Sequence, residues 1–271
     1  MTAINTNISA LKAQNSLAAN ARSMTSTMEQ LSTGTRVNSA KDDAAGLAIG
    51  TTMTSQIRGL NQAVRNANDG VNLLQTAEGA MVEQTNMLQR MRELAVQSVN
   101  ATNSTQQREY LNKEFEELTS QIGNIGDQTM WNSTQVLASA TLTFQVGNAS
   151  DTVFTVDIRS TAIGSGGLEI DALAIDTASG ASDSLATIDS ALDTVNGQRA
   201  QLGATMNRLT YTADNLSNVS ANLAASRSNI MDTDYATASS NLSLSQIIQQ
   251  AATAMLAQAN QQPQSVLALL K

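Results

Sequence analysis

The chain has 271 residues and a formal charge of −8 at pH 7; 41% of its residues are hydrophobic but only 3% are aromatic. The negative charge argues against binding to nucleic acid, because proteins that bind a phosphate backbone present a basic face. The absence of cysteine excludes disulfides and thiolate metal sites, and the absence of histidine removes the commonest general base and zinc ligand.

The first predicted element is a polar helix at the N-terminus. Apolar residues at positions 4–31 recur at helical spacing but are diluted by Asn, Ser and Thr, and positions 244–255 have the same character. Isolated helices this polar are marginal in water, so we expect both ends to be disordered in the monomer and to fold only on assembly. Residues 1–20 contain neither a long apolar run nor a cleavage site of small residues, so we expect neither a membrane span nor a cleaved signal peptide.

Three longer helices follow from heptad spacing. Apolar residues from Met53 to Leu74 alternate steps of four and three and resume at Met81, which predicts a helix over about residues 44–100. A second seam spans residues 111–125, and a third spans residues 185–230, where Arg199, Ser220 and Arg227 interrupt it. Such stripes cannot bury themselves alone, so we expect a mainly α fold, an elongated antiparallel coiled-coil-like helical bundle.

A change of period between the second and third helices predicts a small β-hairpin region. Apolar and polar residues alternate over residues 141–146 and again over 153–158, with a Gly- and Asn-containing link between them. Residues 160–183 are expected to form a loop with weak strand content. Nothing in this stretch could form a second sizeable domain.

Paired carboxylates are the remaining candidates for chemistry. Asp42 and Asp43 suit the start of a helix, where carboxylates accept from free backbone amides, and Glu116 and Glu117 suit a solvated helix face. We therefore expect no catalytic, cofactor-binding or metal-binding residue, no cofactor, and no enzyme activity.

Several runs of sequence together resemble the two ends of bacterial flagellins. In the first 137 residues they are LSTG at 31–34, RVNSAKDDAAGLAI at 36–49, RNANDG at 65–70, QTAEGA at 75–80 and QRMRELAVQ at 89–97. In the last 87 residues they are RAQLGA at 199–204, NRL at 207–209, DYA at 234–236, QANQ at 258–261 and VLALL at 266–270. The resemblance is to a short form that lacks large outer domains.

This resemblance implies a structural subunit that polymerises into the bacterial flagellar filament for motility. It divides the chain into an inner-tube part with a spoke (1–40), two helices of an outer-tube bundle (41–137), a hairpin with a short variable segment (138–184), a C-terminal rod (185–233) and a second inner-tube part (234–271). The expected self-assembly seams are formed by Ile4, Ile8, Leu11, Leu17, Met24, Met28, Leu31, Leu244, Ile248, Met255, Leu267 and Leu270.

The resemblance also implies partners and a location. The partners would be other copies of the chain, hook-filament junction proteins, a filament cap protein and a flagellin export chaperone, with no nucleic acid and no membrane insertion. Export through the flagellar type III apparatus would deliver the chain to an extracellular filament.

Contacts with host innate immune receptors are a further implication. Arg90, Leu94 and Glu114 fall where flagellins recognised by an extracellular Toll-like receptor carry contact residues. Val266, Leu269 and Leu270 fall where a cytosolic inflammasome receptor reads the C-terminus.

The chain departs from the family pattern in places. Trp131, Asn132 and Ser133 replace Phe-Asn-Gly, which concerns a turn, and Asn229 and Ala238 replace an Arg and a Glu that would form a charge pair between helices. Two other functions stay open: a hook-filament junction protein, and a surface adhesin or glycan binder on a flagellin scaffold.

Overall fold

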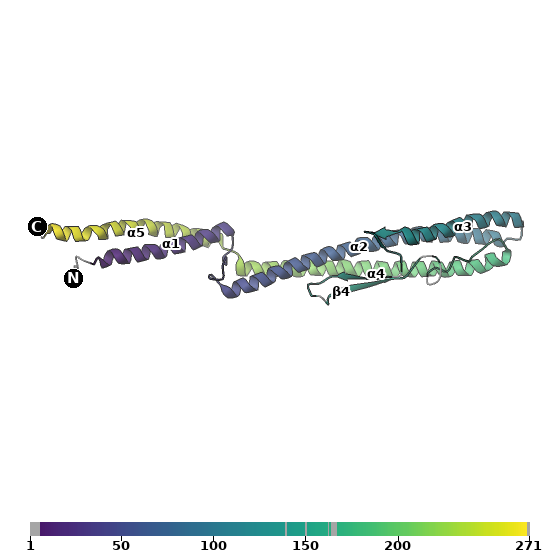
Figure 1. Ribbon diagram of the computed structural model, residues 1–271, viewed down its shortest axis with the longest axis horizontal. Helices are drawn as coiled ribbons and strands as arrows, with labels where there is room; N and C mark the ends of the chain where they lie inside the picture. The colour runs from purple at the N-terminus through teal and green to yellow at the C-terminus, as the bar shows by residue number, and fades with distance from the viewer. Residues whose placement is uncertain (1–5, 139, 150, 162, 164–166, 270–271) are drawn as a thin grey trace. The chain divides into compact units, whose positions relative to one another are not determined.

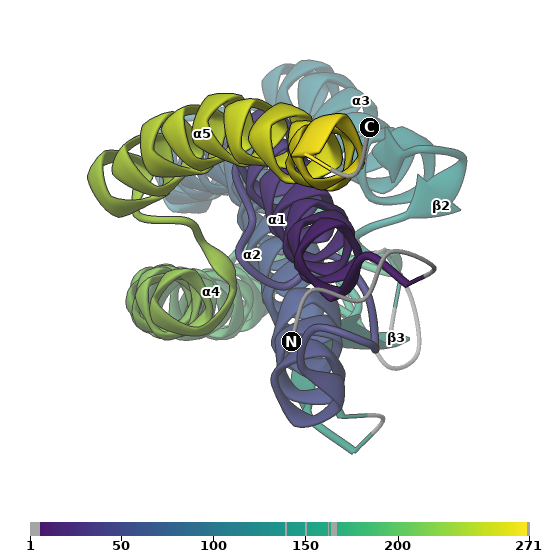
Figure 2. The same ribbon diagram turned by 90° about the vertical axis from the view of Figure 1, so that its left-hand side faces the viewer.

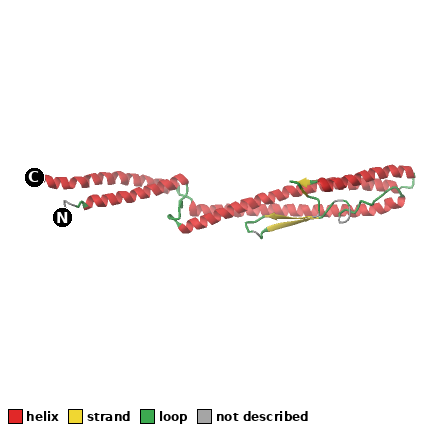
Figure 3. Ribbon diagram, in the orientation of Figure 1, coloured by secondary structure: helices red, strands yellow, loops and turns green. Residues whose placement is uncertain are grey.

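A computed structural model describes residues 6–138, 140–149, 151–161, 163 and 167–269, with the backbone alone at residues 140 and 262–269. Within these residues the chain is mainly helical (Figure 3), as predicted. The helices are α1 (Ile8–Thr33), α2 (Ala44–Val99), α3 (Thr105–Gln128), α4 (Ala178–Met231) and α5 (Tyr235–Leu269). The strands are β1 (Met130–Trp131), β2 (Thr134–Gln135), β3 (Ala140–Gln145) and β4 (Val153–Ile158).

The chain forms two compact units. We call Met1–Ile57 with Ala221–Lys271 the terminal unit, and Arg58–Ser220 the central unit. The long helices α2 and α4 contribute residues to both units.

In the terminal unit, α1 and α5 lie side by side and antiparallel (Figures 1 and 2). Two asparagine side chains fix the register of the two helices. The side-chain amide of Asn7 donates to the Ala259 carbonyl at 2.7 Å, and the side-chain amide of Asn20 donates to the Ser245 carbonyl at 2.8 Å. Helix α1 ends at Thr33 and is capped by Gly34, whose φ of 73° lies in the left-handed region that favours glycine.

The segment between α1 and α2 is held by hydrogen bonds to α4 and by hydrogen bonds within itself. The Arg36 amide donates to the Met231 carbonyl at 2.6 Å, which joins this segment to the last turn of α4. The Asp43 carboxylate accepts from the Gly46 amide at 2.8 Å, so it caps the start of α2 as expected. Asp42 instead accepts from the backbone amide and hydroxyl of Ser39, and therefore stabilises the turn before the helix.

In the central unit, α2, α3 and α4 share one apolar core, which confirms the predicted bundle. The helix predicted over residues 44–100 is α2 (Ala44–Val99). Complete burial of such side chains contributes roughly 1.5–3 kcal/mol each. The fully buried large residues of the three helices are Leu74, Met81, Leu88, Met91, Leu94, Phe115, Ile122, Ile188, Leu202 and Leu209.

The residues that interrupt the apolar seam of α4 have polar partners on α2. The Arg199 guanidinium forms an ion pair with the Glu78 carboxylate at 2.9 Å, and the Ser220 hydroxyl donates to the Asn61 side chain at 2.9 Å. In the terminal unit, Arg227 donates to the Thr54 hydroxyl at 3.5 Å. The interruptions therefore align α4 against α2.

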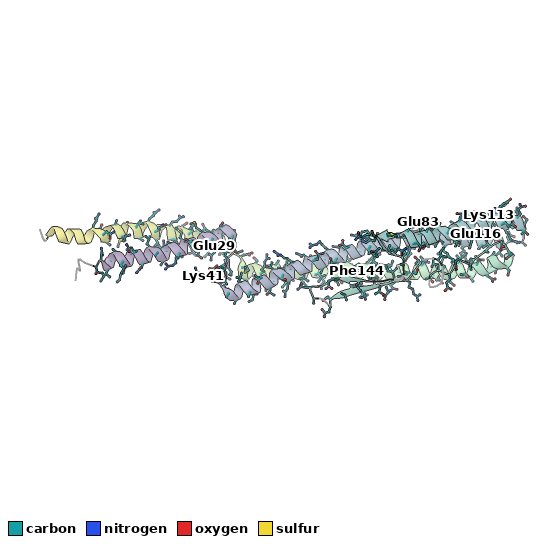
Figure 4. The ribbon with its side chains drawn as sticks, viewed as in Figure 1. Glu29, Lys41, Glu83, Lys113, Glu116 and Phe144 are labelled. Atoms are coloured by element: carbon teal, nitrogen blue, oxygen red, sulfur yellow. The ribbon has the colours of Figure 1, made fainter. Side chains whose placement is uncertain are left out.

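The predicted hairpin is β3 and β4, which pair antiparallel with Phe144 opposite Phe154. It lies on the helices of the central unit (Figure 4): the Asn66 amide donates to the Gln145 carbonyl at 2.9 Å, and the Arg208 guanidinium lies 4.7 Å from the centre of the Phe154 ring. This cation–π contact ties β4 to α4.

One feature of the central unit was not predicted. A second, two-residue hairpin joins β1 to β2 through Asn132 and Ser133, which both have positive φ, 48° and 65°. Strands of two residues are too short to show an alternation of apolar and polar residues in the sequence. Positive φ at both central residues is the requirement of a type I′ turn, where Asn is accepted and Gly is preferred.

The expected loop over residues 160–183 needs a correction, because α4 begins at Ala178. The Thr177 hydroxyl accepts from the Gly180 amide at 3.1 Å and starts the helix early. The described residues before it are irregular but belong to the core, since Ile170 and Ile175 are fully buried. The Ser98 hydroxyl donates to the Ile175 carbonyl, which fastens the segment to α2.

Candidate self-association surface

The helix pair α1 and α5 packs through small and polar side chains. Only Ala10, Thr27, Ala238 and Ser245 are buried among its described residues. Half-buried residues recur between them at steps of three and four, which is the spacing of a seam between two helices. On α1 these are Ala13, Leu17, Asn20, Met24 and Leu31, and on α5 they are Leu242, Gln249, Ala252, Leu256 and Ala259.

The large apolar side chains of this pair are mostly exposed. They are Ile8, Leu11 and Met28 on α1, and Leu244, Ile247, Ile248 and Met255 on α5. We call these seven residues the terminal apolar surface. Exposed apolar residues scattered singly are ordinary, but a concentration of them on one helix pair makes that pair a candidate for self-association.

Charge is almost absent from this surface. Helix α5 contains no Asp, Glu, Lys or Arg in its 35 residues, and α1 contains only Lys12, Arg22 and Glu29. An uncharged helix that exposes large apolar side chains is poorly suited to permanent contact with water, and well suited to burial against another chain.

The predicted seam residues fall into two groups. Leu17, Met24 and Leu31 are half-buried at the contact between α1 and α5. The others that the structure describes are exposed on the terminal apolar surface, where Ile247 joins them although the sequence analysis did not name it. Ile4 and Leu270 lie outside the described residues, and Leu267 is described by its backbone alone.

A polar hollow lies between α1 and the segment before α2. Its lining includes Arg22, Glu29, Lys41 and Asp42, of which Glu29 and Lys41 are labelled in Figure 4. Hydrogen bonds from the hydroxyl and backbone amide of Ser39 hold the pKa of Asp42 below its usual value. Among the residues that the structure describes, no three Asp or Glu side chains converge to hold a metal ion.

The residues expected at immune-receptor contacts are only partly exposed. Arg90 and Glu114 lie about half-exposed and form an ion pair at 2.9 Å, and Arg90 also reaches Glu93 at 3.0 Å. Leu94 is buried in the core, so it presents no surface in this structure. Val266 and Leu269 are described by their backbone alone, and Leu270 lies outside the described residues.

Comparisons with known proteins agree with this architecture. Residues 4–141 match the bacterial flagellin N-terminal helical region, and residues 185–270 match the bacterial flagellin C-terminal helical region. The chain is 44% identical over 279 aligned residues to a flagellin of Halalkalibacterium halodurans, and the match covers 99% of each chain. The interval between the two regions is too short for a large outer domain.

Solved structures show the same fold. The crystal structure of Bacillus cereus flagellin is similar with a TM-score of 0.50 and 27% identity, over 56% of this chain and 88% of that one. A putative flagellar hook-associated protein from Vibrio parahaemolyticus has a TM-score of 0.61 at 16% identity, over 70% of this chain and all of that one. At that identity the second likeness concerns the fold alone and does not favour a junction protein.

No helix in the described part of the chain is both long and apolar enough to cross a bilayer. From the two family regions, the identity over the whole chain and the helical architecture, the chain belongs to the flagellin family, and it is a structural subunit of a bacterial flagellar filament.

Proposed function

We propose that copies of this subunit join through the terminal apolar surface. The observation that carries the proposal is the exposure of seven large apolar side chains on a helix pair whose longer member has no charged residue. Burial of each against a neighbouring copy would contribute up to roughly 1.5–3 kcal/mol. Contacts between unlike faces that do not close into a ring generate an open helical polymer, as a filament requires.

In this proposal residues 1–40 and 234–271 form the inner part of the filament, and the remaining segments surround it. Residues 41–137 and 185–233 supply the surrounding bundle, and residues 138–184 supply its hairpin and variable segment. The concentration of uncovered apolar side chains on α1 and α5 supports an inner position for these helices, away from water.

We propose further that the two ends fold completely only on assembly. The pair buries no large apolar side chain among its described residues, so packing within one copy contributes little to helix stability. Neighbouring copies would supply the missing contacts. Far-UV circular dichroism should therefore show more helix per residue in filaments than in monomers, and equal helix content would contradict this proposal.

The test of the assembly surface compares full-length protein with a form lacking residues 1–31 and 242–271. Electron microscopy after seeded or salt-induced assembly should show uniform filaments for the first and none for the second. Thermal unfolding of the central unit serves as the control, because its core lies outside the removed segments. Filaments from the shortened form would refute the proposed surface.

Partners outside the homopolymer follow from the same surface. An export chaperone that covers the exposed apolar residues of α5 would prevent premature assembly, and junction and cap proteins would contact the two ends of the polymer. Passage through the type III apparatus as an unfolded chain is compatible with the absence of cysteine, because no disulfide has to be broken.

The receptor contacts also remain proposals. The half-exposed pair of Arg90 and Glu114 supports recognition by the Toll-like receptor, whereas buried Leu94 could act only by supporting α2 from within. Purified monomer that fails to activate receptor-expressing cells would refute this contact. An unchanged inflammasome response after Leu269→Ala and Leu270→Ala would refute the second.

We infer no enzymatic role, since the family is structural.

A further inference from the structure

All sulfur in this chain is methionine sulfur, because the sequence has 11 methionines and no cysteine. Thioethers are oxidised by peroxides to sulfoxides, which are polar, and methionine sulfoxide reductases reverse the change. In chains with exposed thiols, cysteine competes for the same oxidants. Here the exposed methionines are the sulfur targets.

Exposed methionines are few among the described residues. Met28, Met130 and Met255 are 48%, 56% and 66% exposed, whereas Met81 and Met91 are completely buried and the other described methionines are half-buried. Two of the three exposed methionines, Met28 and Met255, belong to the terminal apolar surface. Met130 lies on β1 of the central unit.

We propose that Met28 and Met255 are oxidation sites through which peroxides control self-assembly. The proposal rests on the proposed function, in which both side chains become buried between copies. A sulfur lone pair attacks one peroxide oxygen and the O–O bond breaks. The sulfur gains that oxygen and is oxidised by two electrons to the sulfoxide, and the other oxygen leaves as water after a proton transfer.

The position of the two methionines makes oxidation effective at two separate levels of the helix pair. The antiparallel register set by Asn7 with Ala259 and by Asn20 with Ser245 places Met255 beside the first turns of α1 and Met28 beside the first turn of α5. A sulfoxide at either level puts a polar group among the large side chains of the terminal apolar surface, and burial of such a group without a partner is unfavourable.

Protection by assembly is a second consequence. In the free subunit both methionine residues are exposed to solvent, whereas in the proposed filament neighbouring copies cover them. The free subunit is therefore the sensitive form, and the finished filament is the resistant one. Met130 is not part of the terminal apolar surface, so its oxidation leaves assembly unaffected.

The experiment treats full-length protein with hydrogen peroxide, as monomer and as filament, and measures the oxidation of each methionine by peptide mass spectrometry. Seeded assembly then gives the critical concentration. The double variant Met28→Leu with Met255→Leu removes both thioethers at similar side-chain volume. Met130→Leu is the matched control. Each protein is compared with its own untreated sample, so the baseline of each variant cancels.

In the monomer, Met28 and Met255 should be oxidised well before Met81 and Met91, and in the filament they should be protected. Oxidation should raise the critical concentration of wild type and of Met130→Leu by roughly tenfold or more, as expected when an apolar contact receives a polar group. The double variant should show no such rise. Treatment of oxidised wild type with methionine sulfoxide reductases should restore assembly.

Wild type that is fully oxidised at both sites and assembles at an unchanged concentration would overturn the inference. So would a double variant that loses assembly as strongly as wild type. Failure of untreated wild type to assemble would instead refute the proposed surface, and it is recognisable because it occurs without oxidant.

Discussion

Replacement of Ile247 by Ser should weaken filament assembly and leave the free subunit unchanged. Ile247 is 63% exposed on α5, so that fraction of its surface is available for burial against a neighbouring copy. Complete burial of an isoleucine is worth roughly 1.5–3 kcal/mol, which gives about 1–2 kcal/mol for the available part. Since each 1.4 kcal/mol changes an equilibrium constant tenfold, the critical concentration should rise about 5- to 30-fold.

The free subunit should tolerate Ile247→Ser because the side chain makes few contacts within one copy and the two residues have similar helix propensities. The matched control is Val96→Ser on α2, where the valine is 51% exposed but lies in the central unit. Pelleting of seeded samples over a concentration series measures both variants. An Ile247→Ser protein that assembles at the wild-type concentration, or an equal loss in both variants, would refute the reasoning.

Four further predictions test the fold. Ser133→Gly should stabilise the central unit by about 0.5–1 kcal/mol, because relief of left-handed strain at a φ of 65° outweighs the larger conformational entropy of glycine in the unfolded chain. Ser104→Gly removes the N-cap of α3 and should instead lower the free energy of unfolding; urea denaturation measures both variants. Gly197→Ala should raise the free energy of unfolding by about 1 kcal/mol, because a Cβ at this position meets nothing within 4 Å and alanine favours the helix. The urea midpoint should therefore increase, and an unchanged midpoint would contradict this. Arg199→Met should cost about 1 kcal/mol by leaving the one-third exposed Glu78 carboxylate without its partner, and adding Glu78→Gln should recover most of the loss in thermal unfolding. Hydrogen bonds from the Thr237 hydroxyl and from the backbone amides of Thr237 and Ala236 lower the pKa of Asp234. The ionised carboxylate therefore stabilises the start of α5 above the ordinary pKa near 3.9, and this stabilisation is lost as pH falls through the lowered pKa. Helix content measured by circular dichroism should decline below about pH 4 in wild type, and this part of the decline should be absent in Asp234→Asn.

The length and position of α2 could be predicted from apolar spacing, and its buried face could be predicted in part. Of the apolar residues that alternate in steps of four and three between Met53 and Leu74, Leu60 and Leu74 are buried, whereas Val64 and Val71 are half-buried and pack against the core. The buried position beside Val64 is Ala63, and a small residue of this kind carries little hydrophobic signal in the sequence.

Gln84 shows a second limit of sequence reasoning. Its side-chain amide donates to the backbone carbonyls of Ile122 and Thr161, both at 3.3 Å, and so links α2 to α3 and to the segment after the hairpin. The three residues are far apart in sequence. Local periodicity contains no information about such a contact, which depends on how the helices and the hairpin meet.

The self-assembly seams remain a prediction, but the structure divides their residues into two sets. Apolar spacing on each terminal helix does not separate residues that face the other helix from residues that face outward. In the structure Ser245, Ala252 and Leu256 face α1, while Leu244 and Ile247 remain exposed. The exposed set could be located on these helices from spacing, but the separation of a partner-facing seam from an outward surface required the register between α1 and α5.

The polar pairs between α2 and α4 have a consequence for how the chain recovers its structure after unfolding. Two heptad helices with uniform apolar seams could slide by seven residues and bury almost the same area. Here such a slip would separate Arg199 from Glu78 and Ser220 from Asn61. The partly buried carboxylate of Glu78 would then lack its counter-charge. An unfolded chain therefore has one alignment of α4 against α2 that satisfies both pairs, and a copy misaligned by a heptad is less stable than a correctly aligned one.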